Sequence, residues 1–511
     1  MRITNTMMIN SSLANIATNK NQMSILDTQL STKKKISRPS EDPIIAIRAL
    51  RLRSSVNEVT EYLEKNIPDA SSWLKITQGA IEESETITQK LEQYCIQGST
   101  DTYSTEERST IASSMQDLKD TYYKQGNVDD AGRYVFTGFR TDSSLTFMTD
   151  ADADNYSYDI TQSFDAADFD TKYVYENSID ITDLEGYIAG TKTAGEVNRE
   201  EVYRLTLAYN KCSDEIPDVS YKAADGSTVN ITPVLTHDAN AIPGDDEMLY
   251  NPDTGELLMG KNVYSTIKNQ KDLTVAYTKT DFDKGDLKPE HYFYCVRTDQ
   301  KEKAADEAEG KTYTPVEYNK SLKDADPPYG YVDQSVEYIV NFQQKMRINS
   351  TAAQCFDPYF GRDVDNLSNS VATVMDLEDA QARLKEMKAS ALYADDASQA
   401  KIEALQAALD KEYALAHDSM QKVCETGITQ MQDYLGASSK EGSVVGNRIS
   451  SLELTTTRLT TQQTNLKSLR SKNEDVEIED IAINYTSAEL VYNASLTAAS
   501  KVVRQSLLDF L

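Results

Sequence analysis

Apolar side chains recur at steps of three and four residues near both ends of this 511-residue chain. Such spacing averages 3.5 residues, the repeat that forms the seam of a coiled coil. The N-terminal stripe consists of Ile9, Leu13, Ile16, Met23 and Leu30. The C-terminal stripe consists of Val445, Ile449, Leu452, Leu459 and Leu466. The two ends are therefore predicted to be long helices that pair with one another. The alternative is two unrelated amphipathic helices, each packed on a local core.

A third apolar stripe occupies the last predicted helix. Its steps of three, four and four residues approach an eleven-residue repeat, which describes a nearly straight helix. The stripe consists of Tyr485, Ala488, Tyr492, Leu496, Ala499, Val503, Leu507 and Phe510. Because an isolated helix is only marginally stable in water without tertiary packing, we expect a partner to cover this stripe.

Proline and tyrosine separate the outer parts of the chain from its middle. Eight of the 12 prolines and 18 of the 30 tyrosines lie between residues 141 and 340, together with turn signals such as NPDTGE and DKGD. The predicted fold is mainly α: long coiled-coil-like helices from both termini forming a rod, with a β-rich inserted outer domain. The expected segments are an N-terminal assembly helix (1–42), a helical rod segment (43–144), a β-rich acidic insertion (145–350), a second helical rod segment (351–472) and a C-terminal assembly helix (473–511).

The net charge of -30 is unevenly distributed. Residues 1–53 carry nine basic and three acidic side chains, a net +6, and residues 443–511 carry seven basic and eight acidic ones, a net -1, so about -35 falls between them. A surface of that sign repels nucleic acid and anionic membranes. The sequence also lacks both an apolar run long enough to span a membrane and the apolar core of a cleaved signal peptide. We therefore expect no nucleic-acid partner, no membrane insertion and no ordinary secretory leader.

Sequence motifs for catalysis or metal binding are absent. HExxH, GxSxG and Walker-type patterns do not occur, and the five cysteines and three histidines stand far apart, which predicts free thiols. DADAD, from Asp150, begins like a calcium loop but lacks the required Gly and Glu, so we predict a solvated acidic loop. Trp73 is predicted to be a core anchor. We expect no enzyme activity, no cofactor and no metal. An enzyme carried in the insertion is an alternative, recognisable by a pair of Asp or Glu side chains that converge in a pocket.

The stretch KKISRPSEDP, Lys34–Pro43, is predicted to connect two helices. Ser40 and Asp42 are residue types that cap helix N-termini, and Pro43 suits a first helical turn. The lysines that begin at Lys33 would place positive charge at the end of the preceding helix, where it stabilises the helix dipole.

These motifs resemble the flagellin superfamily and, within it, the hook–filament junction proteins. QLSTKKKISRPSEDPIIAIRALRLR, from Gln29, is similar to the family signature QL.TGKRI..PSDDP.AA.R.L.L, and GRYVFTGF, from Gly132, is similar to the exit from its first helical region. SVVGNRISSLE and the last 39 residues resemble its C-terminal helices. Three departures stand out: Lys33 and Lys34 replace the usual Gly-Lys, Pro68 interrupts the second helix, and the middle is far larger than in the compact family form.

The resemblance implies a structural subunit of the flagellum without catalysis. Such subunits are exported unfolded by the flagellar type III apparatus, without a cleaved signal, to an extracellular location. A flagellar export chaperone would hold the C-terminal helices. The subunit would self-assemble and contact neighbouring hook-associated protein 1 and flagellin subunits, with the three stripes as its assembly interface. A filament flagellin is the nearest alternative, and a cytoplasmic coiled-coil scaffold would require the motif match to be accidental.

Overall fold

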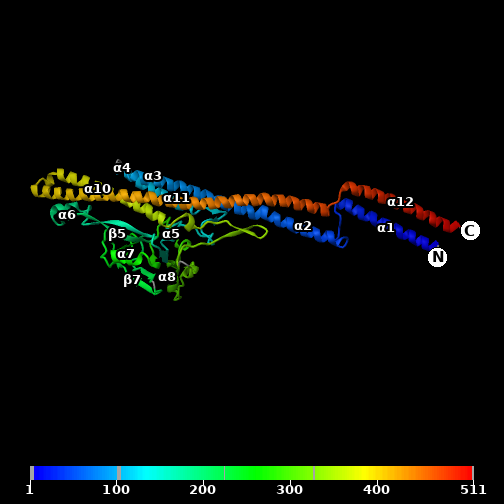
Figure 1. Cartoon of the computed structure of the whole chain (residues 1–511), viewed down its shortest axis with the longest axis horizontal. Helices are drawn as coiled ribbons and strands as arrows, with labels where there is room; N and C mark the ends of the chain where they lie inside the picture. Colours follow the sequence, from blue (N-terminus) through cyan, green and yellow to red (C-terminus); the bar gives the residue numbers. More distant parts are fainter. Residues whose placement is uncertain (1–4, 101–104, 224, 326–327, 509–511) are drawn as a thin grey trace. The chain divides into compact units, whose positions relative to one another are not determined.

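The computed structural model describes residues 5–100, 105–223, 225–325 and 328–508 and forms two compact units. Unit 1 comprises Met1–Ala70, Tyr338–Met346 and Ser450–Leu511, and unit 2 comprises Ser71–Glu337 and Arg347–Ile449. Long helices occupy both ends of the chain and a β-rich domain lies between them in the sequence (Figure 1), which confirms the predicted mainly α fold with a β-rich insertion.

Unit 1 contains two pairs of helices. The first pair is α1 (Asn5–Thr32) packed along α12 (Ile478–Leu508). The second is α2 (Pro43–Glu61) beside the part of α11 (Asp396–Glu474) that lies beyond residue 449. Gln463 Nε2 donates to Thr60 Oγ1 at 2.7 Å, and Asn473 Nδ2 donates to Ile45 O at 3.1 Å. These two contacts run in opposite sequence directions, so α2 and this part of α11 are antiparallel.

The beginning of α2 follows the local sequence. The side chain of Asp42 accepts hydrogen bonds from the N–H groups of Ile44 and Ile45 at 2.9 and 3.0 Å. Pro43 occupies the first helical position, where a backbone N–H would have no partner inside the helix. The predicted cap is therefore confirmed, with Asp42 as the capping residue.

Pro68 does not interrupt the second helix as predicted. A π-helical turn (Tyr62–Asn66) follows α2 directly, and α3 (Ile67–Gly98) begins at the next residue. The N–H of Ile67 donates to the carbonyl of Tyr62, five residues earlier. Pro68 is therefore the second residue of α3 and directly follows the π-helical turn, inside a run of helical residues from Pro43 to Gly98.

The hairpin of β14 (Glu337–Asn341) and β15 (Gln344–Arg347) contacts this π-helical turn within unit 1. The ring of Phe342 meets the ring of Tyr62 edge-to-face at 5.6 Å, and Asn66 Nδ2 donates to Ile339 O at 2.8 Å. The two ends of the π turn are thus both held by the hairpin.

The long helices in the described part of unit 2 are α4 (Thr105–Gln125), α10 (Tyr359–Ala389) and the remaining parts of α3 and α11. Ion pairs join α4 to α10 in an antiparallel arrangement, Lys119 with Asp365 at 2.7 Å and Arg108 with Glu378 at 2.6 Å. Trp73 of α3 is buried, as predicted, and the Arg133 guanidinium lies 5.2 Å from the centre of its ring.

The β-rich part of unit 2 contains two larger sheets. The antiparallel six-stranded sheet has the order β13 (Val316–Tyr318), β12 (Tyr294–Asp299), β3 (Tyr156–Phe164), β11 (Lys271–Lys279), β6 (Asp218–Lys222) and β7 (Thr228–Ile231). The five-stranded sheet has the order β4 (Phe169–Glu176), β5 (Asn198–Thr206), β10 (Glu256–Met259), β9 (Met248–Asn251) and β8 (Val234–Leu235), with β8 parallel to β9. A small hairpin pairs β1 (Asp129–Asp130) with β2 (Arg133–Tyr134).

An aromatic cluster joins the helices of unit 2 to its β-rich part. Tyr122 of α4 stacks on Phe360 of α10 with ring centres 3.7 Å apart, and its hydroxyl donates to Cys355 O at 3.0 Å. The hydroxyl of Tyr292, at the start of the segment that leads into β12, donates to Phe356 O at 2.8 Å. Buried tyrosines therefore keep their hydroxyl groups paired while their rings fill the core.

Short helices complete unit 2. The DADAD stretch forms the helix α5 (Asp150–Ala153), capped by Thr149, so the predicted acidic loop is corrected to a helical turn. The other short helices are α6 (Leu184–Ala189), α7 (Lys261–Ile267), α8 (Gln300–Ala308), α9 (Ala352–Cys355) and the 3₁₀ helices Pro289–His291, Lys320–Asp324 and Ala391–Tyr393. The five cysteines are free thiols, and four of them are buried.

Candidate assembly interface

One stripe of α1 faces one stripe of α12. The shielded positions of α1 follow steps of three and four and are Ile9, Ser12, Ile16, Asn19, Met23, Leu26 and Leu30. Those of α12 are Ile481, Tyr485, Ala488, Tyr492, Ser495 and Ala499. Asn19 Nδ2 donates to Ser495 Oγ at 2.8 Å, so a polar pair fixes the register of a largely apolar contact.

The α1 stripe differs from the predicted one at Leu13, which lies outside the contact with 57% of its surface exposed. Ser12, Asn19 and Leu26 are partly buried, whereas Leu13, Lys20 and Asp27, each one residue further along, are exposed. This register of the stripe keeps the charged side chains of Lys20 and Asp27 in solvent, where they need no buried partner.

The predicted α12 stripe divides into three groups. Tyr485 and Tyr492 are partly buried, and Leu496 remains 42% exposed. Phe510 lies outside the described residues, as do the side chains of Val503 and Leu507.

The stripe at 445–466 lies on α11 and does not face α1. Val445, Leu452 and Leu459 are buried, and Ile449 and Leu466 are partly buried. Beyond residue 449 this helix packs beside α2. The expected pairing of the 9–30 stripe with the 445–466 stripe is therefore corrected, because α12 takes that place.

The two connections between the helical pairs lie against each other in a structure that we call the joint, residues 33–35 and 474–476. The N–H of Lys35 donates to Glu474 O at 2.7 Å, and the N–H of Val476 donates to Lys33 O at 3.3 Å. Lys33 adopts a left-handed conformation with φ of 60°. Glycine takes that conformation without the Cβ strain of other residues.

Ion pairs hold the joint at the C-terminal end of α11. The guanidinium of Arg53 donates twice to the buried carboxylate of Glu474, from Nε and from a terminal nitrogen, both at 2.7 Å. Lys34 Nζ lies 3.4 Å from Glu474 and 2.5 Å from Asp475. The hydrogen bond from Arg53 is the largest cause of the lowered pKa of Glu474, and the hydrogen bond from Lys34 is the largest cause of the lowered pKa of Asp475.

The lysine run consequently acts on a different helix from the one predicted. Lys34 pairs with carboxylates at the end of α11, and Lys35 Nζ donates to the carbonyl of Lys472. The positive charges therefore satisfy the C-terminal end of α11 rather than that of α1.

Unit 1 keeps many large apolar side chains in solvent. They occur on all four of its long helices and include Met7, Met8, Leu13, Ile25, Ile44, Ile47, Leu50, Leu454, Leu469, Ile478, Ile483, Leu490, Val491 and Leu496. Apolar surface gathered in this way on one compact unit is typical of surfaces that another molecule covers.

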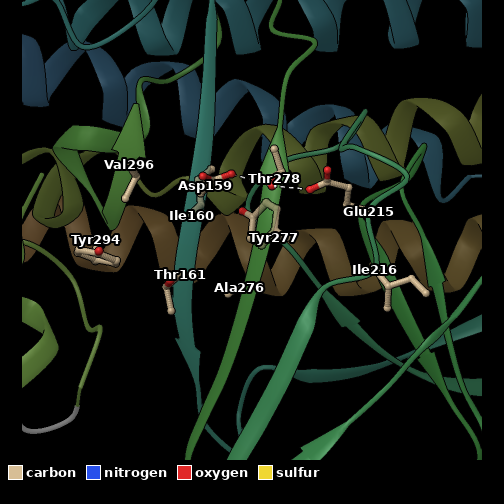
Figure 2. A pocket seen from close by; sticks show the side chains of 10 residues that line it. All are labelled: Asp159, Ile160, Thr161, Glu215, Ile216, Ala276, Tyr277, Thr278, Tyr294 and Val296. Atoms are coloured by element: carbon tan, nitrogen blue, oxygen red, sulfur yellow. Dashed lines mark hydrogen bonds between the residues drawn. The ribbon is translucent and has the colours of Figure 1, made fainter. Parts of the chain in front are cut away.

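A shallow pocket on the exposed face of the six-stranded sheet brings two carboxylates together (Figure 2). The Thr278 hydroxyl lies 2.7 Å from Asp159 and 3.5 Å from Glu215, and its single proton favours the nearer carboxylate. Since Asp159 lies on β3 and Glu215 in the segment before β6, no short sequence spacing signals the pair. The lining contains no His, Cys, Lys or Arg, so it can bind hydroxyl groups but offers neither an activated nucleophile nor a cationic stabiliser.

Within the described ranges, no group of three or more His, Cys, Asp or Glu side chains could hold a metal ion. No described helix is both long and apolar enough to cross a membrane.

Comparison with known proteins identifies flagellar relatives. Residues 3–139 match the bacterial flagellin N-terminal helical region. The chain is 25% identical to flagellar hook-associated protein 3 of Salmonella typhimurium over 169 residues, which cover 33% of this chain and 53% of that protein. It is 26% identical to flagellar hook-associated protein 3 of Escherichia coli over 146 residues, 28% of this chain and 45% of that protein. The chain thus spans about half the length of these curated relatives.

Solved structures with related descriptions show weaker likeness. A putative flagellar hook-associated protein from Vibrio parahaemolyticus aligns over 85% of this chain and 100% of that chain, with 10% identity and a TM-score of 0.32. The flagellar junction protein FlgL from Legionella pneumophila aligns over 79% and 99%, with 10% identity and a TM-score of 0.28. Scores this low carry no argument. The sequence matches show that the N-terminal part of the chain is similar to the bacterial flagellin N-terminal helical region, and that the chain is similar to flagellar hook-associated protein 3.

Proposed function

We propose that this chain is a structural subunit of the bacterial flagellum that joins the hook to the filament. The observation that carries the proposal is the pairing of α1 with α12 in a unit whose long helices keep large apolar side chains exposed. Two of its curated relatives are hook-associated protein 3. A subunit of a polymer needs such surfaces, because its neighbours cover them after assembly.

The assembly segments in this proposal are residues 1–42 and 473–511. The half-buried stripe of the α1–α12 pair would hold each subunit together, and the apolar side chains outside that stripe would meet neighbouring subunits. The partners are further copies of the chain and the neighbouring hook-associated protein 1 and flagellin subunits.

The proposal includes export in an unfolded form by the flagellar type III apparatus, without a cleaved signal, and an extracellular location. A flagellar export chaperone would cover the C-terminal helices before assembly. Free cysteines are compatible with such a route, because a chain without disulfides can pass a narrow channel in extended form. The family role also makes enzymatic activity unnecessary to the proposed function.

Filament flagellin is the second candidate, because a flagellin from Clostridium tyrobutyricum is 28% identical over 120 residues, 24% of this chain and 32% of that protein. The two candidates differ in where the subunit is used. A junction subunit is confined to one end of the filament, whereas a filament subunit occupies its whole length.

A matched pair of variants tests the proposal in cells that lack the native gene. Ile16→Asp places a carboxylate in the α1–α12 contact, whereas Thr18→Asp places the same group on an exposed position of α1. We expect Ile16→Asp to abolish hook–filament joining and swimming, and Thr18→Asp to preserve both. Normal flagella in the Ile16→Asp strain would contradict assembly through the paired helices, provided that immunoblots show equal amounts of both variants.

A further inference from the structure

The face of α2 that points away from α11 is apolar and basic. Ile44, Ile47 and Leu50 are between 54 and 79% exposed. Ile44 and Ile47 lie on the side opposite to the buried positions that begin with Ala46 and Ala49, and Leu50 lies at the edge of that side. Arg48 and Arg51 are exposed beside them, and neither forms an ion pair with any residue that the structure describes. We call these five residues the basic face of α2.

The face of α12 that points away from α1 is apolar and acidic. Ile483 and Leu490 are 68 and 71% exposed, on the side opposite to the tyrosines of the α1 contact. Glu479 and Asp480 lie in the first turn of the helix, and within the described part of the chain neither has an ion-pair partner. We call these four residues the acidic face of α12.

We propose that the basic face of α2 in one copy of the chain binds the acidic face of α12 in a second copy. This inference rests on the proposed function, a subunit that assembles with copies of itself, and it names the surfaces that meet. Both faces combine exposed apolar side chains with unpaired charge of opposite sign, so contact would cover the apolar groups and pair the charges together.

The dimensions of the two faces agree. Leu50 lies six positions after Ile44, and Leu490 lies seven positions after Ile483. At about 1.5 Å of rise per residue these spans are roughly 9 and 10.5 Å. The apolar side chains of one helix can therefore lie along those of the other over about two turns.

Charge favours α12 over the other helices of unit 1 as the partner surface. The part of α11 within unit 1 presents Arg458, Lys467 and Arg470, which would repel the basic face of α2. Helix α1 carries Asp27 as its single carboxylate and Lys20 as its single basic side chain. The first turn of α12 carries Glu479 and Asp480, carboxylates with which the arginines of the basic face can pair.

The contact joins two different surfaces, so each pair of copies leaves one free face of each kind. A heterologous contact of this type repeats from copy to copy instead of closing after two. Such a contact suits a subunit that adds to the end of a growing structure.

Charge reversal in separate chains tests the proposal with full-length protein. One variant carries Arg48→Glu and Arg51→Glu, the other carries Glu479→Lys and Asp480→Lys, and a third carries all four substitutions. Sedimentation velocity at physiological salt measures self-association, with a Debye length of about 8 Å that limits long-range repulsion between the acidic units. Lys20→Glu, an exposed reversal on α1, is the matched control.

We expect each two-site variant alone to self-associate at least tenfold more weakly than the wild type. An equal mixture of the two variants, and the four-site variant, should regain association, because opposite charges again face each other. The control should behave as wild type, and circular dichroism should show that all the variants keep their helices.

The proposal is overturned if the two-site variants associate like the wild type, if the mixture does not recover, or if the wild type remains monomeric at every concentration. None of these results depends on where the protein lies in the flagellum, so they leave the proposed function to its own tests.

Discussion

The ion pairs of the joint give a quantitative test of how the two helical pairs of unit 1 are connected. Arg53→Met keeps most of the side-chain length but removes both hydrogen bonds to Glu474. The buried carboxylate would then keep only Lys34, 3.4 Å away. Removing one partner of a buried ion pair costs about 3–5 kcal/mol, whereas exposed pairs contribute about 0–1 kcal/mol. Because Glu474 is buried but the Arg53 side chain is 53% exposed, we expect a loss of roughly 2 kcal/mol.

Hydrogen exchange of the joint measures this loss directly. The N–H groups of Lys35 and Val476 are hydrogen-bonded across the joint, so their exchange reports its opening. A loss of about 2 kcal/mol corresponds to exchange that is faster by roughly 30-fold, since about 1.4 kcal/mol is a factor of ten. Lys20→Met, which removes an exposed cation on α1, is the matched control and should leave exchange unchanged.

A second substitution separates charge from packing. If the cost of Arg53→Met comes from a carboxylate left without its main partner, then adding Glu474→Gln should recover part of the protection. The reasoning is refuted if the joint amides of Arg53→Met exchange less than threefold faster than those of the wild type. It is also refuted if they exchange faster in the double variant than in Arg53→Met alone.

Four further predictions concern the two units separately. Gly79→Ala should raise the stability of unit 2 to urea by about 0.5–1 kcal/mol, because an added Cβ meets no atom within 4 Å in a helix interior. Gly427→Ala should lower it by about 1–3 kcal/mol, because that Cβ would lie 2.8 Å from a Leu367 methyl group. A destabilising Gly79→Ala or a stabilising Gly427→Ala would contradict this packing. Lys33→Gly should slow amide exchange in the joint by relieving a left-handed φ, and faster exchange would count against it. Burial raises the pKa of Asp363 to about 7, so the folded state binds this proton more tightly than the unfolded state does. The free energy of unfolding should therefore fall as pH rises from 6 to 8. In Asp363→Asn, which lacks the titrating group, the fall should be shallower.

Sequence reasoning succeeded where the cause was local. The cap of α2 follows from Asp42 and Pro43 alone, and the burial of Trp73 follows from its apolar neighbours. The apolar spacing of α1 identified Ile9 and Ile16 as members of one stripe. It misplaced Leu13, because the choice between neighbouring positions depends on the polar groups of α12, which the spacing of α1 does not contain.

Long-range pairing could not be predicted in the same way. Strand β3 pairs with β11, more than 100 residues later, through a register that turn signals do not encode. The same limit applies to the joint, where Lys34 meets Asp475 from the other end of the chain. Pro68 illustrates a different limit, since the helix continues past the proline through a π-helical turn directly before α3. Local propensity alone would have ended the helix there.

The proposed role at the hook–filament junction is tested most directly by immuno-electron microscopy of flagella. The antibody should recognise the β-rich insertion, and cells that lack the gene serve as the control. We expect label confined to the boundary between hook and filament. Label along the whole filament would identify a filament subunit instead, and flagella without label would contradict a flagellar location for this protein.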